Sequence, residues 1–446
     1  MLPVTEIATQ QYVEEALMKI QALKLNNYRC FEELDVSFDP QLSVFVGING
    51  SGKTAILEAL VIWLRRYAES FVPDHSELSK SEYTLVRHGA NSASLVVTGT
   101  AYNTENPHET VDFNSSVKLV RNPKNHGLDV NYDGARLSLR EVSRSDGSQR
   151  PVPVVVYYSS KRFANVESKP GESVTDLRYA FVDVFSPQIG FGASLAWFIE
   201  KASQEALEAK RKQDLSHTIP ELSAVRSAVS KALGVYGEPF VGETPPVLFL
   251  PEINDPETAF SIDELSDGFK TMLALVMDLS RRMAIANEYI EWAETETVLH
   301  SPGVVLVDVV ELHLHPSWQQ TVLSTLMEIF PNVQFIVTTH SPQVLTSIRS
   351  KHIRVLKDGK CHLLSEETEG AEAGRVLEDV LGVRSRPDNA IVKKLREYAD
   401  LVDEEKWDLP DAELLRAELE RHFGNSEPKL FELALHVENS KWERYL

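Results

Sequence analysis

A glycine-rich turn between two apolar segments limits most strongly how this chain can fold. The turn GINGSGKT covers residues 47–54 and follows the apolar stretch LSVFV, residues 42–46. Behind the turn, apolar side chains recur with the spacing of one helical face: Ile56, Leu57, Leu60, Val61 and Leu64. The order of strand, tight turn and helix predicts an α/β unit in which the helix packs against a sheet.

The composition of this turn predicts a phosphate-binding loop, because it matches G-x-x-x-x-G-K-[ST] between a strand and a helix. Glycines let the main chain wrap around phosphates, and the amides at a helix start favour negative charge. Lys53 is expected to reach the β- and γ-phosphates of ATP, and Thr54 to bind Mg²⁺. A chance glycine-rich turn is the alternative. The expected nucleotide contacts are Gly47, Asn49, Gly50, Ser51, Gly52, Lys53 and Thr54.

The second half of the chain predicts the sheet that this unit joins. The apolar stretch at residues 303–309, a helix after Pro316 and the stretch VQFIVTT at residues 333–339 follow one another. Apolar strands that alternate with helices indicate an α/β fold with a largely parallel sheet, buried on both faces. Residues 84–160 are β-rich in pattern, and residues 193–235 are helical.

These patterns divide the chain into three parts. Residues 1–19 are expected to form a helical N-terminal extension, because apolar residues share one face of a helix there. Residues 20–345 are expected to form one head with a β-rich N-terminal lobe and a helical insertion at about 165–240. Residues 346–446 are expected to form a helical C-terminal region that either docks a partner or caps the head.

Asp308 ends the strand VVLVD, and Val309 follows it. An acidic residue at this strand end, together with a phosphate loop, predicts a second contact for magnesium. The alternative is an ordinary acidic strand end. Many ATPases carry a water-activating glutamate at the next position, where this chain has valine.

Composition excludes some classes of function. The sequence has 45 Lys and Arg against 66 Asp and Glu, for a net charge of −21, which on average repels a nucleic acid duplex. The apolar runs are too short to cross a membrane, and the first residues lack the pattern of a secretory signal. The two cysteines, Cys30 and Cys361, are expected to be reduced thiols, and the protein cytoplasmic.

Two further motifs are weak alone. LSDGFK, residues 265–270, reads as a helix start with Ser266 as its N-cap. TTHSPQVL, residues 338–345, places His340 after a strand, where a histidine is most often structural. His313 and His315 in LHLHP invite a metal interpretation, but no further ligand cluster is visible.

The four motifs, in this order and spacing, resemble those of the SMC/ABC-type ATPases. The segment LKLNNYRCFEELDVSF before the glycine-rich turn is similar to the opening strands of that class. The resemblance implies that Ser266 and Gly268 present a helix N-terminus to the γ-phosphate held by another subunit. It also implies that His340 senses γ-phosphate and that Arg29 approaches the nucleotide.

The stretch ELHLHPSWQQ is similar to the OLD-like and RecF-like branch and to bacterial antiphage ATPases. The downstream stretch GRVLEDVLGVRSRP (374–387) resembles the antiphage PtuA ATPases of Septu systems and related retron modules. LHLHP then implies a loop that contacts the opposite subunit. The tail after residue 346 offers neither the acidic cluster of a Toprim nuclease nor an HNH constellation. The resemblance therefore implies a separate nuclease, an HNH protein of PtuB type, and nucleic acid contact through that complex.

Comparison with the pattern DEIDLHLHP of these relatives places Val309 at the catalytic glutamate and Glu311 at the later acid. In an extended chain Glu311 would lie roughly 10 Å beyond Asp308, so we expect that it does not replace the base without a distortion of the loop. Loss of a general base costs a factor of about 10²–10⁴ in rate. We therefore expect a nucleotide binder with weak hydrolysis.

Three hypotheses follow. The first is a regulatory ATPase subunit of an antiphage complex, a head-to-tail dimer or larger homo-oligomer around ATP that controls an HNH nuclease. The second is a RecF- or OLD-like DNA repair ATPase that hydrolyses ATP on DNA, which the acidic charge and Val309 disfavour. The third is the nucleotide-binding subunit of a transporter, which would need a membrane partner.

Overall fold

The computed structural model describes residues 18–72, 84–102, 110–122, 127–134, 151–162, 176–186, 191–242, 246–288, 290 and 295–445. It divides into two compact units, Met1–Val376 and Leu377–Leu446, and each is described by itself. Apart from its last two residues, the expected N-terminal helical extension lies outside the described residues, and Lys19 already begins a strand.

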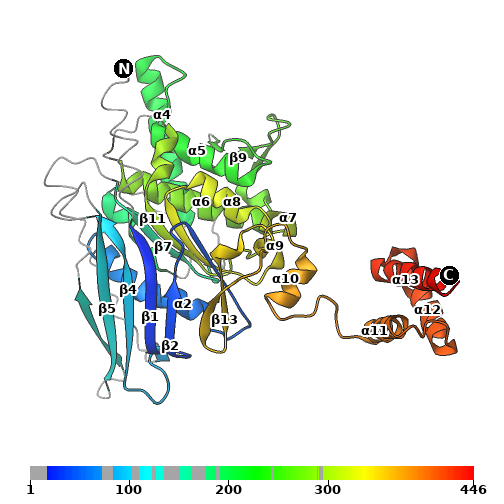
Figure 1. Ribbon diagram of the computed structural model, residues 1–446. Coiled ribbons are helices and arrows are strands. Elements are labelled where there is room, and N and C mark those ends of the chain that lie inside the picture. Colours follow the sequence, from blue (N-terminus) through cyan, green and yellow to red (C-terminus); the bar gives the residue numbers. More distant parts are fainter. Residues whose placement is uncertain are drawn as a thin grey trace, which may run out of the picture. The chain divides into compact units, whose positions relative to one another are not determined.

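A six-stranded sheet forms the centre of the first unit (Figure 1). Its strands, in spatial order, are β14 (Lys360–Leu363), β13 (Ile353–Lys357), β3 (Leu42–Val46), β12 (Val333–Thr338), β11 (Gly303–Val307) and β7 (Val154–Tyr158). All neighbours are parallel except β14, which is short and antiparallel to β13. The strands β3, β12, β11 and β7 are buried throughout, as their continuous apolar sequences predict.

A five-stranded antiparallel sheet forms the β-rich lobe. Its spatial order is β2 (Phe31–Ser37), β1 (Lys19–Tyr28), β4 (Ser92–Tyr102), β5 (Thr110–Asn122) and β6 (Gly127–Gly134). The helix α2 (Lys53–Ala68) contacts both sheets, since it packs on β12 and β7 and also on β4. Twelve of its side chains are buried, which explains why its apolar stripe is so wide.

Gln334 joins the two sheets through the interior. This side chain lies in the central strand β12 and is fully buried. Its Oε1 accepts a hydrogen bond from the amide of Ile20 at 2.8 Å, and its Nε2 donates to the carbonyls of Ile20 at 2.8 Å and Asp39 at 2.9 Å. A buried amide with all these partners fixes the start of β1 beside β12.

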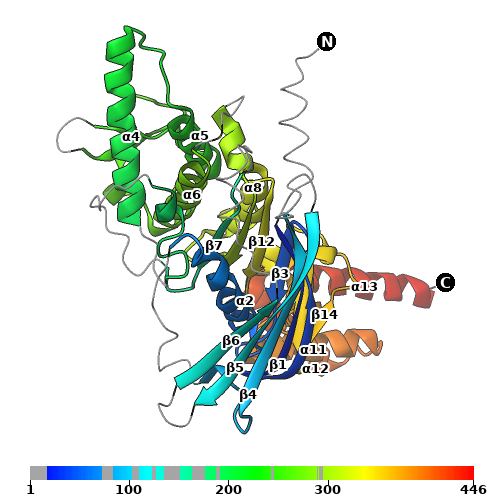
Figure 2. The ribbon, with the colours of Figure 1, turned by 90° about the vertical axis from the view of Figure 1, so that its left-hand side faces the viewer.

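Helices gather on the side of the central sheet away from the antiparallel sheet (Figures 1 and 2). They are α4 (Phe191–Lys212), α5 (Pro220–Leu233), α6 (Asp267–Ala286) and α8 (Val322–Ile329). The expected helical insertion contains α4 and α5, although residues 163–175 and 187–190 lie outside the described part. A small antiparallel sheet between α5 and α6 comprises β8 (Phe240–Val241), β9 (Leu248–Pro251) and β10 (Ala259–Ser261).

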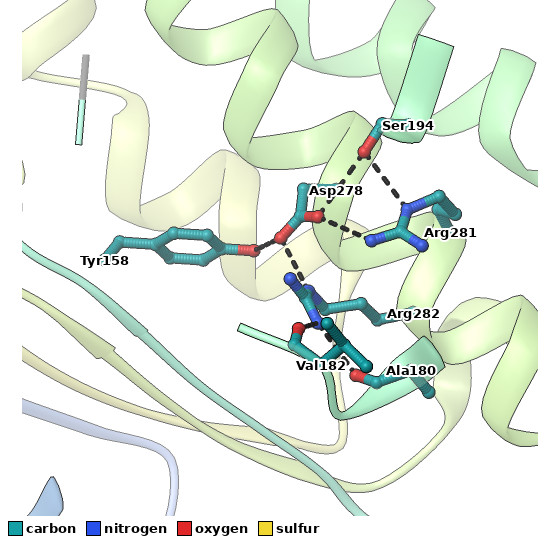
Figure 3. Close-up of polar contacts among 7 residues, drawn as sticks. All are labelled: Tyr158, Ala180, Val182, Ser194, Asp278, Arg281 and Arg282. Carbon is teal, nitrogen blue, oxygen red and sulfur yellow. Dashed lines mark hydrogen bonds and ion pairs between the residues drawn. The ribbon is translucent and has the colours of Figure 1, made fainter. Parts of the chain in front are cut away.

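A buried carboxylate holds α6 against β7 (Figure 3). Asp278 of α6 is 1% exposed, and its Oδ2 accepts from the hydroxyl of Tyr158 at 3.0 Å and from Nε of Arg282 at 2.7 Å. Its Oδ1 accepts from Nη2 of Arg281 at 3.0 Å and from the hydroxyl of Ser194 at 3.4 Å. Every oxygen of this carboxylate is therefore paired with at least two donors.

The two guanidinium groups extend this network. Nη1 of Arg282 donates to the carbonyls of Ala180 and Val182, both at 2.9 Å (Figure 3). Burial alone would raise the pKa of Asp278, but Arg282 and Arg281 outweigh it and hold that pKa below its usual value. One carboxylate thus connects α6, β7 and the segment at residues 180–182.

Residues 353–363 differ from the sequence expectation, which placed them in the helical C-terminal region. They form the hairpin β13–β14 and extend the central sheet. The turn residues Asp358 and Gly359 both have positive φ, 51° and 73°, which is the geometry that a two-residue Asp-Gly hairpin turn requires. The Asp-Gly pair between apolar strands was the local signal for this hairpin.

The second unit is helical. Its elements are α11 (Ala390–Asp403), α12 (Pro410–Phe423) and α13 (Pro428–Tyr445), and α10 (Ala373–Asp379) precedes them across the division. Its buried core consists of Leu395, Tyr398, Val402, Ala412, Leu419, Leu430, Leu433 and Val437. Arg386 donates two hydrogen bonds to the carboxylate of Glu427, at 3.1 and 2.7 Å, which joins the segment before α11 to the start of α13.

Short helical turns complete the described chain. They are α7 (Pro316–Gln319), α9 (Pro342–Leu345) and the 3₁₀ turns η2 (Leu177–Ala180), η3 (Ile262–Glu264), η4 (Thr295–His300), η5 (Ser350–His352) and η6 (Gly424–Ser426).

Replacement of the buried carboxylate by Asp278→Ala is expected to destabilise the protein by about 3–5 kcal/mol, because two buried guanidinium groups lose their counter-charge. Urea unfolding monitored by circular dichroism measures this change. Ser194→Ala is the matched control, since it removes one neutral hydroxyl from the same network and should cost about 1 kcal/mol. Equal effects of the two variants would contradict a structural role for the charge.

Candidate functional site

The candidate site lies at the carboxyl ends of parallel strands. The segments that follow β3, β7, β11 and β12 all leave the sheet at one edge, because these four strands are parallel and adjacent. This edge of an α/β sheet is where ligands commonly bind. It brings together the glycine-rich turn, Asp308 and His340, which are far apart in the sequence.

The glycine-rich turn needs its glycines for space as well as for conformation. Gly52 has a φ of 98°, and a Cβ atom there would lie 2.2 Å from Cζ of the buried Phe31 ring. Gly50 has a φ of 82°, but a Cβ there would meet nothing within 4 Å. The N–H of Ser51 donates to the carbonyl of Ile48 at 3.1 Å and closes the turn. The helix α2 begins directly behind it, at Lys53.

Lys53 is largely buried, with 7% of its surface exposed. Burial lowers the pKa of Lys53 below its ordinary value, while Asp308 and Glu311 act in the opposite direction. A lysine at this point of a phosphate loop supplies a cation for phosphate oxygens.

Asp308 is the buried acid of the site, with 3% exposure. Its carboxylate accepts from the hydroxyl of Thr54 at 3.1 and 3.2 Å and from the hydroxyl of Thr338 at 2.7 Å. A threonine oxygen and a carboxylate in contact are the hard oxygen ligands that Mg²⁺ prefers, so the donor set fits that ion. The structure thus brings both expected magnesium residues together.

A cavity of about 330 Å³ opens over these groups. It is lined by Arg29, Cys30, Asn49, Gly50, Gly52, Lys53, Thr54, Ala55, Asp308, Val309 and His340. Most of the residues expected from the sequence therefore line one space, whereas Gly47 and Ser51 shape the turn without lining it. Burial and the neighbouring Lys53 lower the pKa of His340, although Glu311 and Asp308 oppose them.

Arg29 lies on the wall of this cavity, and its Nη2 pairs with Oε2 of Glu58 at 2.5 Å. Glu58 stands one helical turn after Thr54 on α2. Burial raises the pKa of Glu58, the charge of Arg29 opposes that rise, and Asp308 adds to it. Arg29, Thr54 and Asp308 also border a second cavity of about 360 Å³ that Glu58 lines. Glu58 was not among the residues expected from the sequence, although its helical spacing from Thr54 was the available signal.

Arg162 is a second residue that the sequence analysis missed. It is 1% exposed and donates to the carbonyls of Asp308 and, at 2.9 Å, Val309. Burial lowers the pKa of Arg162 to about 10, so this side chain remains a cation at neutral pH. Arg162 lies four residues after the end of β7 and belongs to no sequence motif that would have indicated its role. It fixes the main chain at Val309, the position where many ATPases carry a catalytic glutamate.

The chain does not continue in the extended direction after Asp308, so the extended geometry from which the separation of Asp308 and Glu311 was expected does not apply. Val309 has a φ of 56°, which a β-branched residue rarely adopts. The amide of Val310 donates to the carbonyl of Thr338 at 3.0 Å, and the chain turns across the end of β12. Glu311 consequently contacts the segment after β12.

Ser266 and Gly268 do not line the phosphate cavity of their own chain. Ser266 is the N-cap of α6, and its side chain makes no capping hydrogen bond. A Cβ at Gly268 would lie 2.9 Å from the carbonyl of His313, so glycine is needed for the close approach of α6 to the LHLHP loop.

One histidine of LHLHP, His315, has a structural contact. His315 is the N-cap of α7, and its Nδ1 lies 2.9 Å from the hydroxyl of Ser317. In the part of the chain that the structure describes, no group of three or more His, Cys, Asp and Glu residues is placed to hold a metal ion.

Residues 42–346 match the protein family described as "AAA domain, putative AbiEii toxin, Type IV TA system". The chain belongs to this AAA domain family. The match spans the glycine-rich turn, Asp308 and His340, and it confirms the sequence-based assignment to the AAA ATPases.

Relatives of similar length extend this assignment. The chain is 28% identical to "Retron Ec83 probable ATPase" of Escherichia coli, over 98% of this chain and 90% of the relative. It is 21% identical to "Septu protein PtuA" of Bacillus thuringiensis, over 94% of this chain and 98% of the relative. The predicted relationship to PtuA is thereby confirmed. Similarity to "DNA replication and repair protein RecF" of Lactococcus lactis, at 51% identity, covers only 10% of this chain and 12% of that relative.

Among solved structures, the AAA domain chain is similar to "SMC head domain from Thermotoga maritima", with a TM-score of 0.41 and 14% identity over 78% of this chain and 98% of that one. Among the residues that the structure describes, no helix is both long and apolar enough to cross a membrane.

Gly52→Ala is expected to lower the affinity for Mg·ATP at least about tenfold more than Gly50→Ala does. Both changes place a side chain at positive φ, which costs about 1–2 kcal/mol, but only the methyl group at residue 52 collides with Phe31. Titration of each folded variant with a fluorescent ATP analogue measures the difference. Similar losses in both variants would show that conformation alone, and not space, limits the turn.

Proposed function

We propose that this protein is an ATP-binding regulatory subunit of an antiphage defence complex, with weak hydrolysis of its own. The observation that supports the proposal most is the composition of the phosphate cavity. Thr54 and Asp308 meet beside Lys53, as binding of Mg·ATP requires, while Val309 occupies the position that follows the acid.

Weak hydrolysis follows from the acids around the cavity. Among the described residues that line it, Asp308 is the one carboxylate, and hydroxyl groups of Thr54 and Thr338 already occupy its oxygens. Glu311 accepts hydrogen bonds from the segment after β12. Without a glutamate directly after Asp308 to act as the general base, proton transfer from an attacking water is slower, and the rate falls by about 10²–10⁴.

Thr54 and Asp308 would hold Mg²⁺, which supplies charge neutralisation for phosphate oxygens when it is bound. Lys53 adds a fixed positive charge in a largely buried position. The amides of the glycine-rich turn and of the start of α2 would add a preference for negative charge. These groups bind phosphate and do not move protons, so binding survives where hydrolysis is weak.

A second copy of the chain would complete the site. Ser266 and Gly268 lie outside the phosphate cavity of their own chain, yet they begin a long buried helix whose N-terminus favours anions. A head-to-tail homo-oligomer would bring them to the nucleotide of a neighbouring copy. The LHLHP loop packs against Gly268 and would take part in the same contact.

The partner in this proposal is a separate HNH nuclease of PtuB type, because the relatives of similar length are retron and Septu proteins. The helical second unit offers a surface for it. Phe431, Leu435 and Trp442 are exposed on α13, on the face opposite the residues that form the unit's core. Nucleic acid would be reached through the complex, in the cytoplasm.

The net charge of −21 disfavours the alternative, a RecF-like or OLD-like repair ATPase that turns over ATP on DNA. The RecF similarity is confined to a short part of the chain. A transporter subunit is disfavoured by the acidic helical second unit.

Val309→Glu is expected to raise the rate of ATP hydrolysis by roughly 10²–10⁴-fold, because it supplies a base beside the cavity. Phosphate release under single-turnover conditions measures it. Val309→Gln, which has the same length but no base, separates proton abstraction from side-chain size and should give far less. Rapid turnover by the unaltered protein would refute the proposal of weak hydrolysis.

Lys53→Ala is expected to abolish nucleotide binding and to disturb an ATP-dependent assembly. Native mass spectrometry with and without Mg·ATP reports both at once. Lys118→Ala, a change of an exposed lysine on β5, is the control for lost charge and should behave as the unaltered protein. If the Lys53 variant forms the same oligomers under every condition, assembly does not depend on nucleotide.

A further inference from the structure

The turn after β11 gives Glu311 a position that the sequence pattern does not suggest. Val309 adopts a φ of 56°, and the amide of Leu312 donates to the carbonyl of Val309 at 3.1 Å. Arg162 holds this turn from the opposite side, because it donates to the carbonyls of Asp308 and Val309. The carboxylate of Glu311 is therefore directed toward the end of β12.

Both oxygens of Glu311 are used by the segment that follows β12. Oε2 accepts from the hydroxyl of Thr339 at 2.8 Å, and Oε1 accepts from the main-chain amide of His340 at 2.7 Å. Hydrogen bonds to a charged acceptor are roughly twice as strong as neutral ones. Two of them on consecutive residues fix both the position and the direction of the main chain at Thr339–His340.

His340 is the residue whose position depends most on this contact. Its side chain lines the phosphate cavity together with Lys53 and Asp308, whereas Glu311 does not line it. No regular element holds His340, since β12 ends at Thr338 and α9 begins at Pro342. The segment is held instead by the two hydrogen bonds that Glu311 accepts and by the amide of Thr339, which donates to the carbonyl of Phe45 at 3.1 Å.

The same turn reaches the start of α6. The carbonyl of His313, two residues beyond Glu311, is the atom that a Cβ at Gly268 would meet at 2.9 Å. One short segment thus contacts His340 at one end and the N-terminal turn of α6 at the other. A shift of His340 would therefore displace the N-terminal turn of α6, which in the proposed oligomer contacts the nucleotide of a neighbouring copy.

We propose that Glu311 is a positioning residue that holds His340 over the phosphate cavity and thereby makes the site distinguish a nucleoside triphosphate from a diphosphate. The inference rests on the proposed function, since it assumes that the cavity binds ATP. Glu311 does not touch the nucleotide and moves no proton. It acts through the main chain of His340, whose imidazole contacts the terminal phosphate.

The test compares the affinities for AMP-PNP and ADP, both with Mg²⁺, in the full-length protein. Glu311→Ala is expected to weaken AMP-PNP binding roughly tenfold, the size of one lost charged hydrogen bond, and to leave ADP binding within about twofold. Glu311→Gln should restore most of the preference, because its oxygen still accepts from His340 and its amide group donates to Thr339. Glu328→Ala, an exposed change on α8, is the control.

A second readout follows His340 directly. The imidazole signal of His340, assigned with His340→Gln, should shift in a ¹³C–¹H NMR spectrum on addition of AMP-PNP and remain in place in Glu311→Ala. Should that variant not fold, Thr339→Val removes one of the two donors and should show the same loss to a smaller extent.

The outcomes separate the two proposals. If the unaltered protein binds neither AMP-PNP nor ADP, the proposed function itself fails. If it prefers AMP-PNP and a folded Glu311→Ala keeps the same preference and the same His340 shift, the role of Glu311 is overturned.

Discussion

The parallel pairing of β3, β12, β11 and β7 is the constraint on which the remaining structure depends. Because these strands run in one direction, the segments after all four leave the sheet at one edge, and residues 47–54, Asp308 and His340 meet there. The buried hydroxyl–carboxylate contacts of Thr54 and Thr338 with Asp308 connect three of these segments. Neither the phosphate loop nor the acid would form a site without that register.

Two buried charged residues, Asp278 and Arg162, connect the interior of the protein to the site. Asp278 holds α6 to Tyr158 at the end of β7, and the carbonyl of Tyr158 accepts from the amide of Asp308 at 2.8 Å. Arg162, just beyond β7, holds the turn after Asp308. A displacement of α6 would therefore be transmitted to Asp308 through side chains with little room to move, since both Tyr158 and Asp278 are buried.

The features that could be predicted from the sequence are those that depend on short contiguous patterns of residues. The phosphate loop, the buried strands and the α/β class follow from glycine spacing and apolar runs, which act locally. Glu311 and Arg162 could not be placed in this way, because their positions depend on the left-handed backbone of Val309 and on neighbours far away in the chain. The β13–β14 hairpin was predictable in part from its Asp-Gly turn, but its pairing with β3 depends on tertiary packing.

The β13–β14 hairpin also limits association of two copies through the edge of the central sheet. A parallel sheet that ended in β3 or β13 would expose a long row of unpaired main-chain groups, to which another chain could add a strand. Here the border strand β14 is four residues long, antiparallel and begins with Lys360, features that discourage such addition. Association by sheet extension is thereby disfavoured on that side. In the proposed homo-oligomer, contacts on that side would then be made by loops and helix ends, which a bound ligand can remodel, whereas a continuous sheet would join the copies permanently.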